Sequence, residues 1–213
     1  MAPTSHSPVG KARILETAER LFLKHGYRAV SIRDIAHACG VTNAALYYYF
    51  PSKEALFWEV LRQHLNRLAE RLRAARAAAP PDPQAQLTAM TQVYAEWVLN
   101  RRASIFALRR DMLAMKHQPS RQKHKPFYDL VLTISRPFEE VLQEAVQSGV
   151  LRQPPLEAPL SGMLLGLLHG ILHSQEDIAN PEALAKAAAQ WAVETLWHGM
   201  AASAAPSPHG ETS

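Results

Sequence analysis

The chain has 213 residues, of which 47% are hydrophobic and 20% are charged, and it carries a formal net charge of +4 at pH 7. This length fits one large domain or two small ones, and the apolar content is sufficient for a buried core. No apolar run approaches the roughly 18 residues of a membrane helix, and the first residues lack the apolar stretch of a signal peptide. Because Cys39 is the single cysteine, no intramolecular disulfide can form. We therefore expect a cytoplasmic protein that does not enter the membrane.

Charge is unevenly distributed along the chain. Residues 1–78 contain twelve Lys and Arg against six Asp and Glu, whereas residues 79–213 contain eleven against thirteen. A basic N-terminal part joined to a mildly acidic remainder suits a head that contacts nucleic-acid phosphates. A solvated charged face is the alternative, because charge by itself does not identify a partner.

Residues 31–50 read SIRDIAHACGVTNAALYYYF and predict two short helices. They follow a helix over about residues 10–25, which is preceded by a polar segment, residues 1–8, that we expect to be disordered. Gly40 stands where a helix ends in a left-handed C-cap, a conformation that glycine adopts most easily. Thr42 is then an N-cap candidate for the second short helix. Two short helices joined by a glycine turn predict a helix-turn-helix, which places its second helix in the DNA major groove.

The order and spacing of these residues resemble the tetracycline-repressor (TetR) family. The resemblance covers about the first third of the chain. It implies an all-α fold of about nine helices, with an N-terminal three-helix DNA-binding domain over residues 9–68 (motif 31–50) and a helical ligand-binding and dimerisation domain over residues 69–200. The residues that carry it are Ile14, Leu15, Ala18, Leu21, Phe22, Gly26, Tyr27, Ser31, Ile35, Ala36, Gly40, Val41, Leu46, Tyr47, Tyr49, Phe50, Ser52, Lys53, Leu56 and Phe57.

Base reading is assigned to the residues that open the second motif helix. The amide of Asn43 can pair bidentately with adenine, and the methyl groups of Thr42 and Ala44 can meet the methyl group of thymine. Thr42 could instead act only as a helix cap. The family pattern often has a basic residue where Asn43 stands, so the preferred base sequence stays open.

Phosphate contacts are assigned to the side chains that flank this helix. The resemblance implies that Lys53 holds a phosphate, and Tyr47 and Tyr48 are hydroxyl donors at a suitable spacing. Ser31 can cap the first motif helix or donate to phosphate, and Arg33 points out of its first turn. Arg33 and Lys53 could also be solvated surface charges. We expect Cys39, in the motif turn, to be a small buried residue and not a redox switch.

The remainder of the chain also reads as helix, interrupted by prolines. Residues 80–83 read PPDP and break the pattern, and the Ala/Ser/Pro-rich tail, residues 201–213, is expected to be disordered. The expected helices run over about residues 52–79, 84–100, 104–115, 127–148, 160–174 and 181–199.

Glycine recurs every four residues in the helix expected before residue 174. Gly162, Gly166 and Gly170 share one side with His169 and His173. Glycine costs roughly 1 kcal/mol inside a helix, so a stripe of three indicates a close approach of another helix. The resemblance implies that this helix and the next pair with their copies in a two-fold four-helix bundle. Space for a ligand is the alternative. On the next helix the interface stripe is Leu184, Ala188, Trp191 and Thr195.

The two histidines could also bind a metal, with His198, Glu176, Asp177 or a residue of a second subunit as a third ligand. Hydrogen-bonded packing is the commoner use of such a pair. We therefore expect no metal and no cofactor.

Apolar and aromatic side chains are abundant between residues 90 and 138. The resemblance implies that a subset of them lines a small-molecule site, and an apolar or amphipathic ligand would suit it. The assigned residues are Met90, Tyr94, Trp97, Met112, Ile134 and Phe138.

The sequence thus predicts a homodimeric, ligand-responsive regulator, a repressor that a small molecule of unknown identity releases from a double-stranded DNA operator. A helical ligand-binding or scaffold protein with a vestigial DNA head is the first rival. A helical-bundle enzyme is the second, and we expect no enzyme, because no set of nucleophile, base and orienting group is visible.

Overall fold

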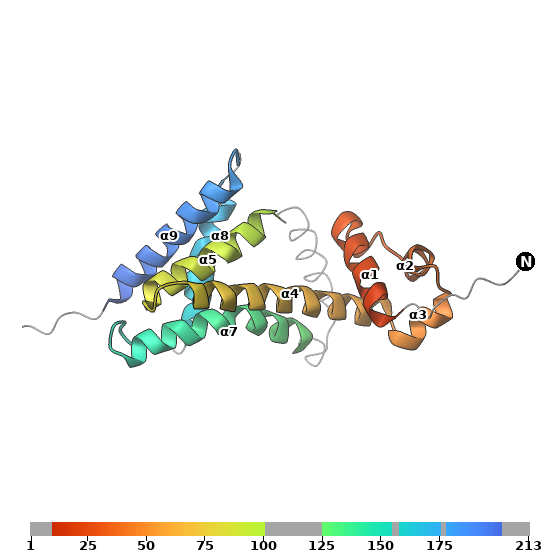
Figure 1. Ribbon diagram of the computed structural model, residues 1–213, viewed down its shortest axis with the longest axis horizontal. Helices are drawn as coiled ribbons and strands as arrows, with labels where there is room; N and C mark the ends of the chain where they lie inside the picture. Colours follow the sequence, from red (N-terminus) through yellow and green to blue (C-terminus); the bar gives the residue numbers. More distant parts are fainter. Residues whose placement is uncertain (1–9, 101–124, 155–157, 176–177, 202–213) are drawn as a thin grey trace, which may run out of the picture. The chain divides into compact units, whose positions relative to one another are not determined.

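The computed structural model describes residues 10–100, 125–154, 158–175 and 178–201, and these ranges are helical throughout apart from short connections (Figure 1). An isolated β-bridge joins Leu151 to Ala201. The expected all-α fold is confirmed. The helices are α1 (Lys11–His25), α2 (Ile32–Cys39), α3 (Asn43–Tyr49), α4 (Lys53–Ala78), α5 (Pro83–Asn100), α7 (Lys125–Gln147), α8 (Leu160–His173) and α9 (Pro181–Met200).

Several expectations fall outside these ranges. They are the helix over 104–115, the disorder of residues 1–8 and of the tail after residue 201, and the roles given to Met112, Glu176 and Asp177. Among the described helices, none is long and apolar enough to cross a membrane.

The chain forms two compact units. The first comprises residues 1–70 and 97–134, and the second comprises residues 71–96 and 135–213. Helices α4, α5 and α7 therefore each contribute residues to both units. The sequence predicts a single division near residue 68, and the second crossing, at residues 96 and 97, affects the candidate sites described below.

Aromatic rings form the centre of the first unit. The ring of Phe57, on α4, lies 5.4 Å from that of Phe22 on α1 and 4.6 Å from that of Tyr27 in the turn after α1. Ile35 of α2 and Leu46 of α3 are fully buried in the same cluster. Apolar side chains of α1, α2, α3 and the first part of α4 thus share one core, which holds α2 and α3 in place.

The second unit is built from the C-terminal part of α4, the first part of α5, most of α7, and the pair α8 and α9. Phe138 and Leu142 of α7 are fully buried in it. The carboxylate of Glu139 on α7 accepts a hydrogen bond of 2.8 Å from the backbone N–H of Ser161, in the first turn of α8. Burial raises the pKa of Glu139, but hydrogen bonds from Gln143 and from the start of α8 outweigh it and hold the pKa below its ordinary value. This carboxylate satisfies an N–H group that has no partner inside the helix, because Pro159, the N-cap, supplies no side-chain acceptor.

Candidate nucleic-acid interface

The turn between α2 and α3 has the geometry that the sequence predicts. Gly40 has φ 70° and ψ 32°, which is the left-handed conformation. Its N–H donates to the carbonyl of His37, and the N–H of Val41 donates to the carbonyl of Ala36, both at 3.0 Å. These bonds end α2 and redirect the chain within two residues, so that α3 can begin at Asn43. The helix-turn-helix is therefore fixed by local backbone hydrogen bonds.

A capping box begins α2. The backbone N–H of Asp34 donates to Ser31 Oγ at 3.1 Å, and the N–H of Ser31 donates to Asp34 Oδ2 at 2.8 Å. The hydroxyl of Ser31 also donates to Asp34 Oδ2, at 2.7 Å. These hydrogen bonds lower the pKa of Asp34. Ser31 thus caps α2, which is one of its two predicted roles, and its hydroxyl proton is donated to the carboxylate of Asp34.

Helix α3 presents polar side chains on one side and Leu46 on the other. The N–H of Ala45 donates to Thr42 Oγ1 at 3.2 Å, so Thr42 is a cap as well. Thr42, Asn43 and Ala44 are exposed, and Tyr47 and Tyr48 are 50% and 83% exposed. The residues assigned to base reading and to two phosphate contacts thus lie together on the open side of α3.

Lys53 is positioned by a contact that the sequence did not suggest. Its ammonium lies 4.2 Å from the centre of the Tyr27 ring, a cation–π geometry. Lys53 is the first residue of α4, which Ser52 caps through its hydroxyl. The charge of Lys53 is therefore held at the start of α4, close in sequence to the end of α3. Arg33 is exposed in the first turn of α2.

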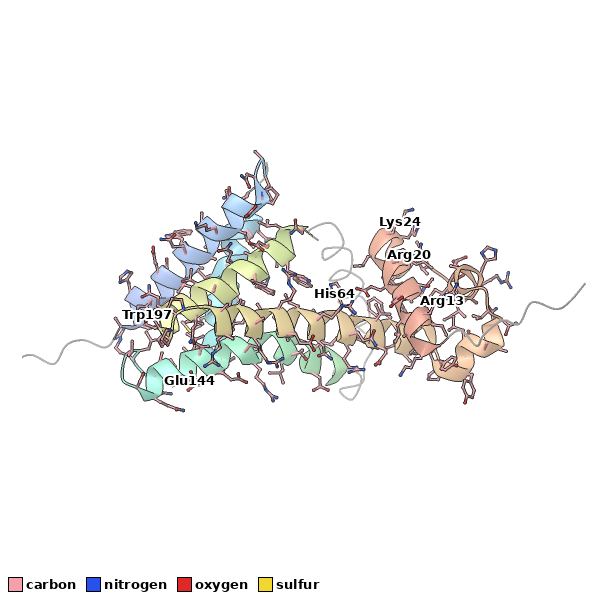
Figure 2. The ribbon with its side chains drawn as sticks, in the orientation of Figure 1. Arg13, Arg20, Lys24, His64, Glu144 and Trp197 are labelled. Carbon is pink, nitrogen blue, oxygen red and sulfur yellow. The ribbon has the colours of Figure 1, made fainter. Side chains whose placement is uncertain are left out.

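Further basic side chains lie along α1, where Figure 2 shows Arg13, Arg20 and Lys24. All three are exposed. Cys39, by contrast, is buried, as expected, and contributes to the core of this head.

A charged cluster joins α1 to α4. Arg67 Nη2 donates to both carboxylate oxygens of Glu19 at 2.6 Å, and His64 Nδ1, on the α4 residue labelled in Figure 2, lies 2.6 Å from Glu19 Oε1. His64 is buried, with its ring 5.6 Å from that of Trp97. Burial raises the pKa of Glu19, but the hydrogen bonds and charges of Arg67 and His64 outweigh it, so the pKa lies below its ordinary value of 4.5.

The sign of this shift predicts how stability depends on pH. A carboxylate whose pKa is lowered by folding stabilises the folded state above its unfolded pKa, and this contribution is lost as the pH falls through the lowered value. We expect Glu19→Gln to reduce the free energy of unfolding at neutral pH. The difference in free energy of unfolding between this variant and the wild type should narrow as the pH falls below 4.5, the ordinary pKa of a glutamate carboxyl group. Urea denaturation at a series of pH values measures it. Glu16→Gln, at an exposed position on the same helix, is the control. If the loss of stability in Glu19→Gln did not depend on pH, the stabilising role of the ionised Glu19 carboxylate would be wrong.

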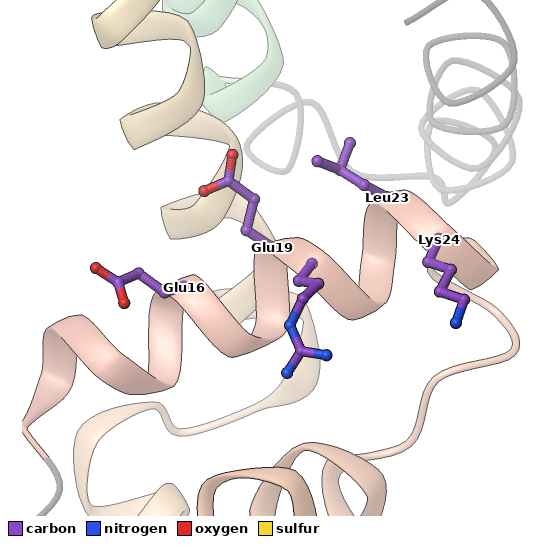
Figure 3. Close-up of a pocket in the computed structure, with 5 residues that line it drawn as sticks. Glu16, Glu19, Leu23 and Lys24 are labelled. Carbon is purple, nitrogen blue, oxygen red and sulfur yellow. The ribbon is translucent and has the colours of Figure 1, made fainter.

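An open hollow lies beside α1 (Figure 3). Among the residues that the structure describes, those that line it belong to α1 and are mostly charged: Glu16, Glu19, Arg20, Leu23 and Lys24. None of these belongs to the predicted ligand-binding set, and the carboxylate of Glu19 is already bound to Arg67 and His64.

The described members of the predicted ligand-binding set fall in both compact units. Met90, Tyr94 and Phe138 are buried in the second unit, whereas Trp97 and Ile134 belong to the first. The assigned set therefore spans both units, because α5 passes from one unit to the other between residues 96 and 97. Periodicity along a helix cannot show that crossing.

On α8 the glycines lie on the exposed side. Gly162, Gly166 and Gly170 are exposed, and a Cβ built at Gly166 or Gly170 would have no described atom within 4 Å apart from the backbone of its own helix. His173 is exposed next to them. His169 is half-buried, and its Nε2 lies 3.1 Å from Tyr94 Oη on α5. His169 therefore faces the interior of its own unit.

On α9, Trp191 is 58% exposed and Thr195 is exposed, while Leu184 is half-buried. Ala188 is buried within its own unit. We therefore leave Ala188 out of the proposed interface stripe, because its methyl group is covered by its own chain.

The two histidines of α8 hydrogen-bond to protein groups. His173 Nδ1 lies 2.7 Å from the carbonyl of His169, whose ring meets Tyr94. Within the residues that the structure describes, no three His, Cys, Asp or Glu side chains come together as metal ligands.

Comparison with known proteins agrees with this geometry. Residues 14–60 match the family "Bacterial regulatory proteins, tetR family". The transcriptional repressor KstR2 of Mycolicibacterium smegmatis is 30% identical over 158 residues, covering 71% of this chain and 73% of the relative.

Solved structures show the same fold. The TetR-family regulator PfmR of Thermus thermophilus aligns with a TM-score of 0.62 at 24% identity, covering 85% of this chain and 97% of that one. FadR of Bacillus subtilis, solved in complex with stearoyl-CoA, aligns with a TM-score of 0.67 at 15% identity, covering 86% and 98%. The helix-turn-helix has a glycine at its turn and an exposed α3, and a repressor is related to the chain over most of the chain's length. The chain therefore belongs to the TetR family and is a DNA-binding transcriptional regulator.

Proposed function

We propose that the protein is a homodimeric repressor that binds a near-palindromic operator and leaves it when a small molecule binds the domain over residues 69–200. The observation that carries the DNA part is the open side of α3, where Thr42, Asn43 and Ala44 are exposed together. One helix of seven residues reads few bases, so a specific site needs two copies on two half-sites. The protein acts where its DNA is, in the cytoplasm.

The dimer proposal is supported by what α8 and α9 leave uncovered. The exposed side of α8 carries the glycines together with Met163, which is 49% exposed, and the exposed side of α9 carries Trp191. Large apolar side chains beside backbone without side chains favour helix-on-helix contact with a second copy, in which the same surface of both chains meets. The proposed stripe is Gly162, Gly166, Gly170 and His173 on α8, with Leu184, Trp191 and Thr195 on α9. His169, which the sequence also assigned to this interface, is left out because its Nε2 lies 3.1 Å from Tyr94 Oη within its own unit.

The repressor and effector parts draw on the relatives. KstR2 is named a repressor, and FadR of Bacillus subtilis was solved with stearoyl-CoA, an amphipathic ligand. The buried apolar side chains of the second unit, such as Met90 and Phe138, would suit the apolar part of such a molecule. The ligand releases DNA only if it favours one arrangement of the dimer over the other.

A DNA retardation assay on a genomic fragment library tests the proposal. We expect a discrete complex whose affinity falls steeply with salt, because bound phosphates release counterions. Binding that is undetectable or insensitive to salt would favour a ligand-binding or scaffold protein with a vestigial head.

Substitutions on α3 and at the start of α4 separate base reading from phosphate contact. We expect Lys53→Ala or Tyr47→Phe to weaken binding to all sequences about equally, since phosphates carry no sequence information. Asn43→Ala should cost about 1–3 kcal/mol at the correct site and relax the preference at one base position. Selection of binding sites from a random pool, followed by sequencing, measures both effects. An unchanged consensus with Asn43→Ala would contradict the base-reading role.

A further inference from the structure

Two polar rings meet between α5 and α8 inside the second unit. Tyr94 Oη and His169 Nε2 are 3.1 Å apart, and the rings are tilted edge to face with centres 5.7 Å apart. Tyr94 is buried, and Phe138 of α7 lies against its ring at 6.2 Å. Three helices thus bring a hydroxyl and an imidazole together among apolar side chains.

A buried hydroxyl without a partner lies close by on the same helix. Thr91 is 0% exposed and stands three residues before Tyr94 on the buried side of α5. Its Oγ1 makes no hydrogen bond with the residues that the structure describes. A buried hydroxyl left unpaired is destabilising, and valine would fill the same volume without this cost. A threonine here therefore presents a buried hydroxyl whose hydrogen bond a bound molecule could supply.

The charges of this unit limit what that partner is. Among the described residues of the second unit, every Lys and Arg is exposed except Arg76, and Arg76 is held by Glu144 at 2.6 Å. A buried carboxylate or phosphate would find no buried cation to offset its loss of hydration. A neutral oxygen meets no such penalty, and hydroxyl and imidazole groups are suited to binding it.

We propose that Thr91, Tyr94 and His169 form the polar end of an effector site, and that the effector presents to them a neutral carbonyl oxygen, as in a ketone, ester or thioester, on an apolar body. This rests on the proposed small-molecule response of the second unit and names the chemistry of that response. Met90, fully buried one residue before Thr91, and Phe138 supply apolar surface for the rest of the molecule.

The test uses the full-length protein and four probes of matched length: methyl hexyl ketone, octanol, octanoic acid and octane. Titration calorimetry and thermal unfolding are followed for the wild type, Tyr94→Phe and Thr91→Val. We expect the ketone to bind the wild type about five- to tenfold more tightly than octane, the value of a buried hydrogen bond. Ionised octanoic acid should bind more weakly than the ketone. Both variants should lose most of the preference for the ketone.

Thr91→Val should also raise the thermal stability of the free protein while it lowers the affinity for the ketone. Without ligand its Tm should rise by about 2–4 °C, because an unpaired buried hydroxyl is removed, while its affinity for the ketone falls. Ser161→Ala is the matched control. Ser161 carries another buried hydroxyl, beside the carboxylate of Glu139, and it stands eight residues before His169 on α8, roughly 12 Å along the helix. This variant should retain the preference for the ketone.

The outcomes separate this inference from the proposed function. Equal affinity of the wild type for ketone and octane, no binding of any probe, or a preference that survives in both variants would overturn the polar site. If the ketone binds as expected but leaves operator affinity unchanged at saturation, the polar site stands and its role in releasing DNA fails. If the ketone releases DNA from wild type and Tyr94→Phe alike, the sensor stands and the polar site fails.

Discussion

Phe57→Ala is expected to lower the free energy of unfolding of the first unit by about 3–5 kcal/mol. Phe57 is fully buried, and its ring contacts Phe22, Tyr27 and Trp58, which come from α1, the turn after it, and α4. Removing the ring leaves a cavity that three separate segments would have to close. The loss is a large part of the roughly 5–15 kcal/mol that stabilises a typical domain.

DNA binding should fail together with the core. Tyr27, which loses its main ring neighbour, is also the residue over which the Lys53 ammonium lies. Urea denaturation followed by far-ultraviolet circular dichroism, with a retardation assay at matched concentrations, measures both effects. Phe57→Leu keeps much of the volume and should cost less. If Phe57→Ala were as stable as the wild type, the aromatic cluster around Phe57 would not be what holds α1 to α4 together.

Gly166→Leu is expected to separate the proposed dimer without destabilising the single chain. Gly166 is exposed on α8, and a Cβ there meets nothing within 4 Å, so leucine fits the chain and improves helix propensity by up to about 1 kcal/mol. In a two-fold interface the same side chain enters twice. Overpacking costs about 1–3 kcal/mol at each copy, so the dissociation constant should rise at least about thirtyfold.

Sedimentation velocity over a dilution series, with circular dichroism and operator binding, measures this prediction. Monomers of unchanged helix content that no longer bind the operator are expected, and Gly166→Ala should give a smaller effect. Lys186→Leu, at an exposed position of α9 away from the Trp191 side, is the control for added surface apolarity. An intact dimer with an altered ligand response would place the glycine stripe at a ligand site instead.

The features that the sequence predicts correctly are those that depend on neighbours within a few residues. Gly40 ends α2 in the left-handed conformation, and Asn180 caps α9 with Pro181 in its first turn. These conformations depend on the intrinsic geometry of glycine and proline and on side-chain bonds spanning three residues. A helix-turn-helix is assembled from such local elements, so its position and its exposed residues can be read from the chain.

Contacts between segments that are far apart in the sequence could be identified only from the folded structure. Nothing in the sequence links Glu19 to His64 and Arg67, 45 and 48 residues away, and the same holds for Tyr94 and His169, which are 75 residues apart. A lone histidine or glutamate on a helix has many potential partners, and only the packing of the helices selects one.

The sequence by itself determined the family, the all-helical class and the position of the helix-turn-helix, because periodicity and caps are local properties of a chain. Only the tertiary structure decided that Trp97 and Tyr94, three residues apart on α5, belong to different units. It also decided that His169 points towards Tyr94 while the neighbouring glycines of α8 are exposed, and that Ala188 is covered by its own chain. Helical spacing defines which residues share a face, but the neighbours that cover the face come from elsewhere in the chain, and their identity is set by packing.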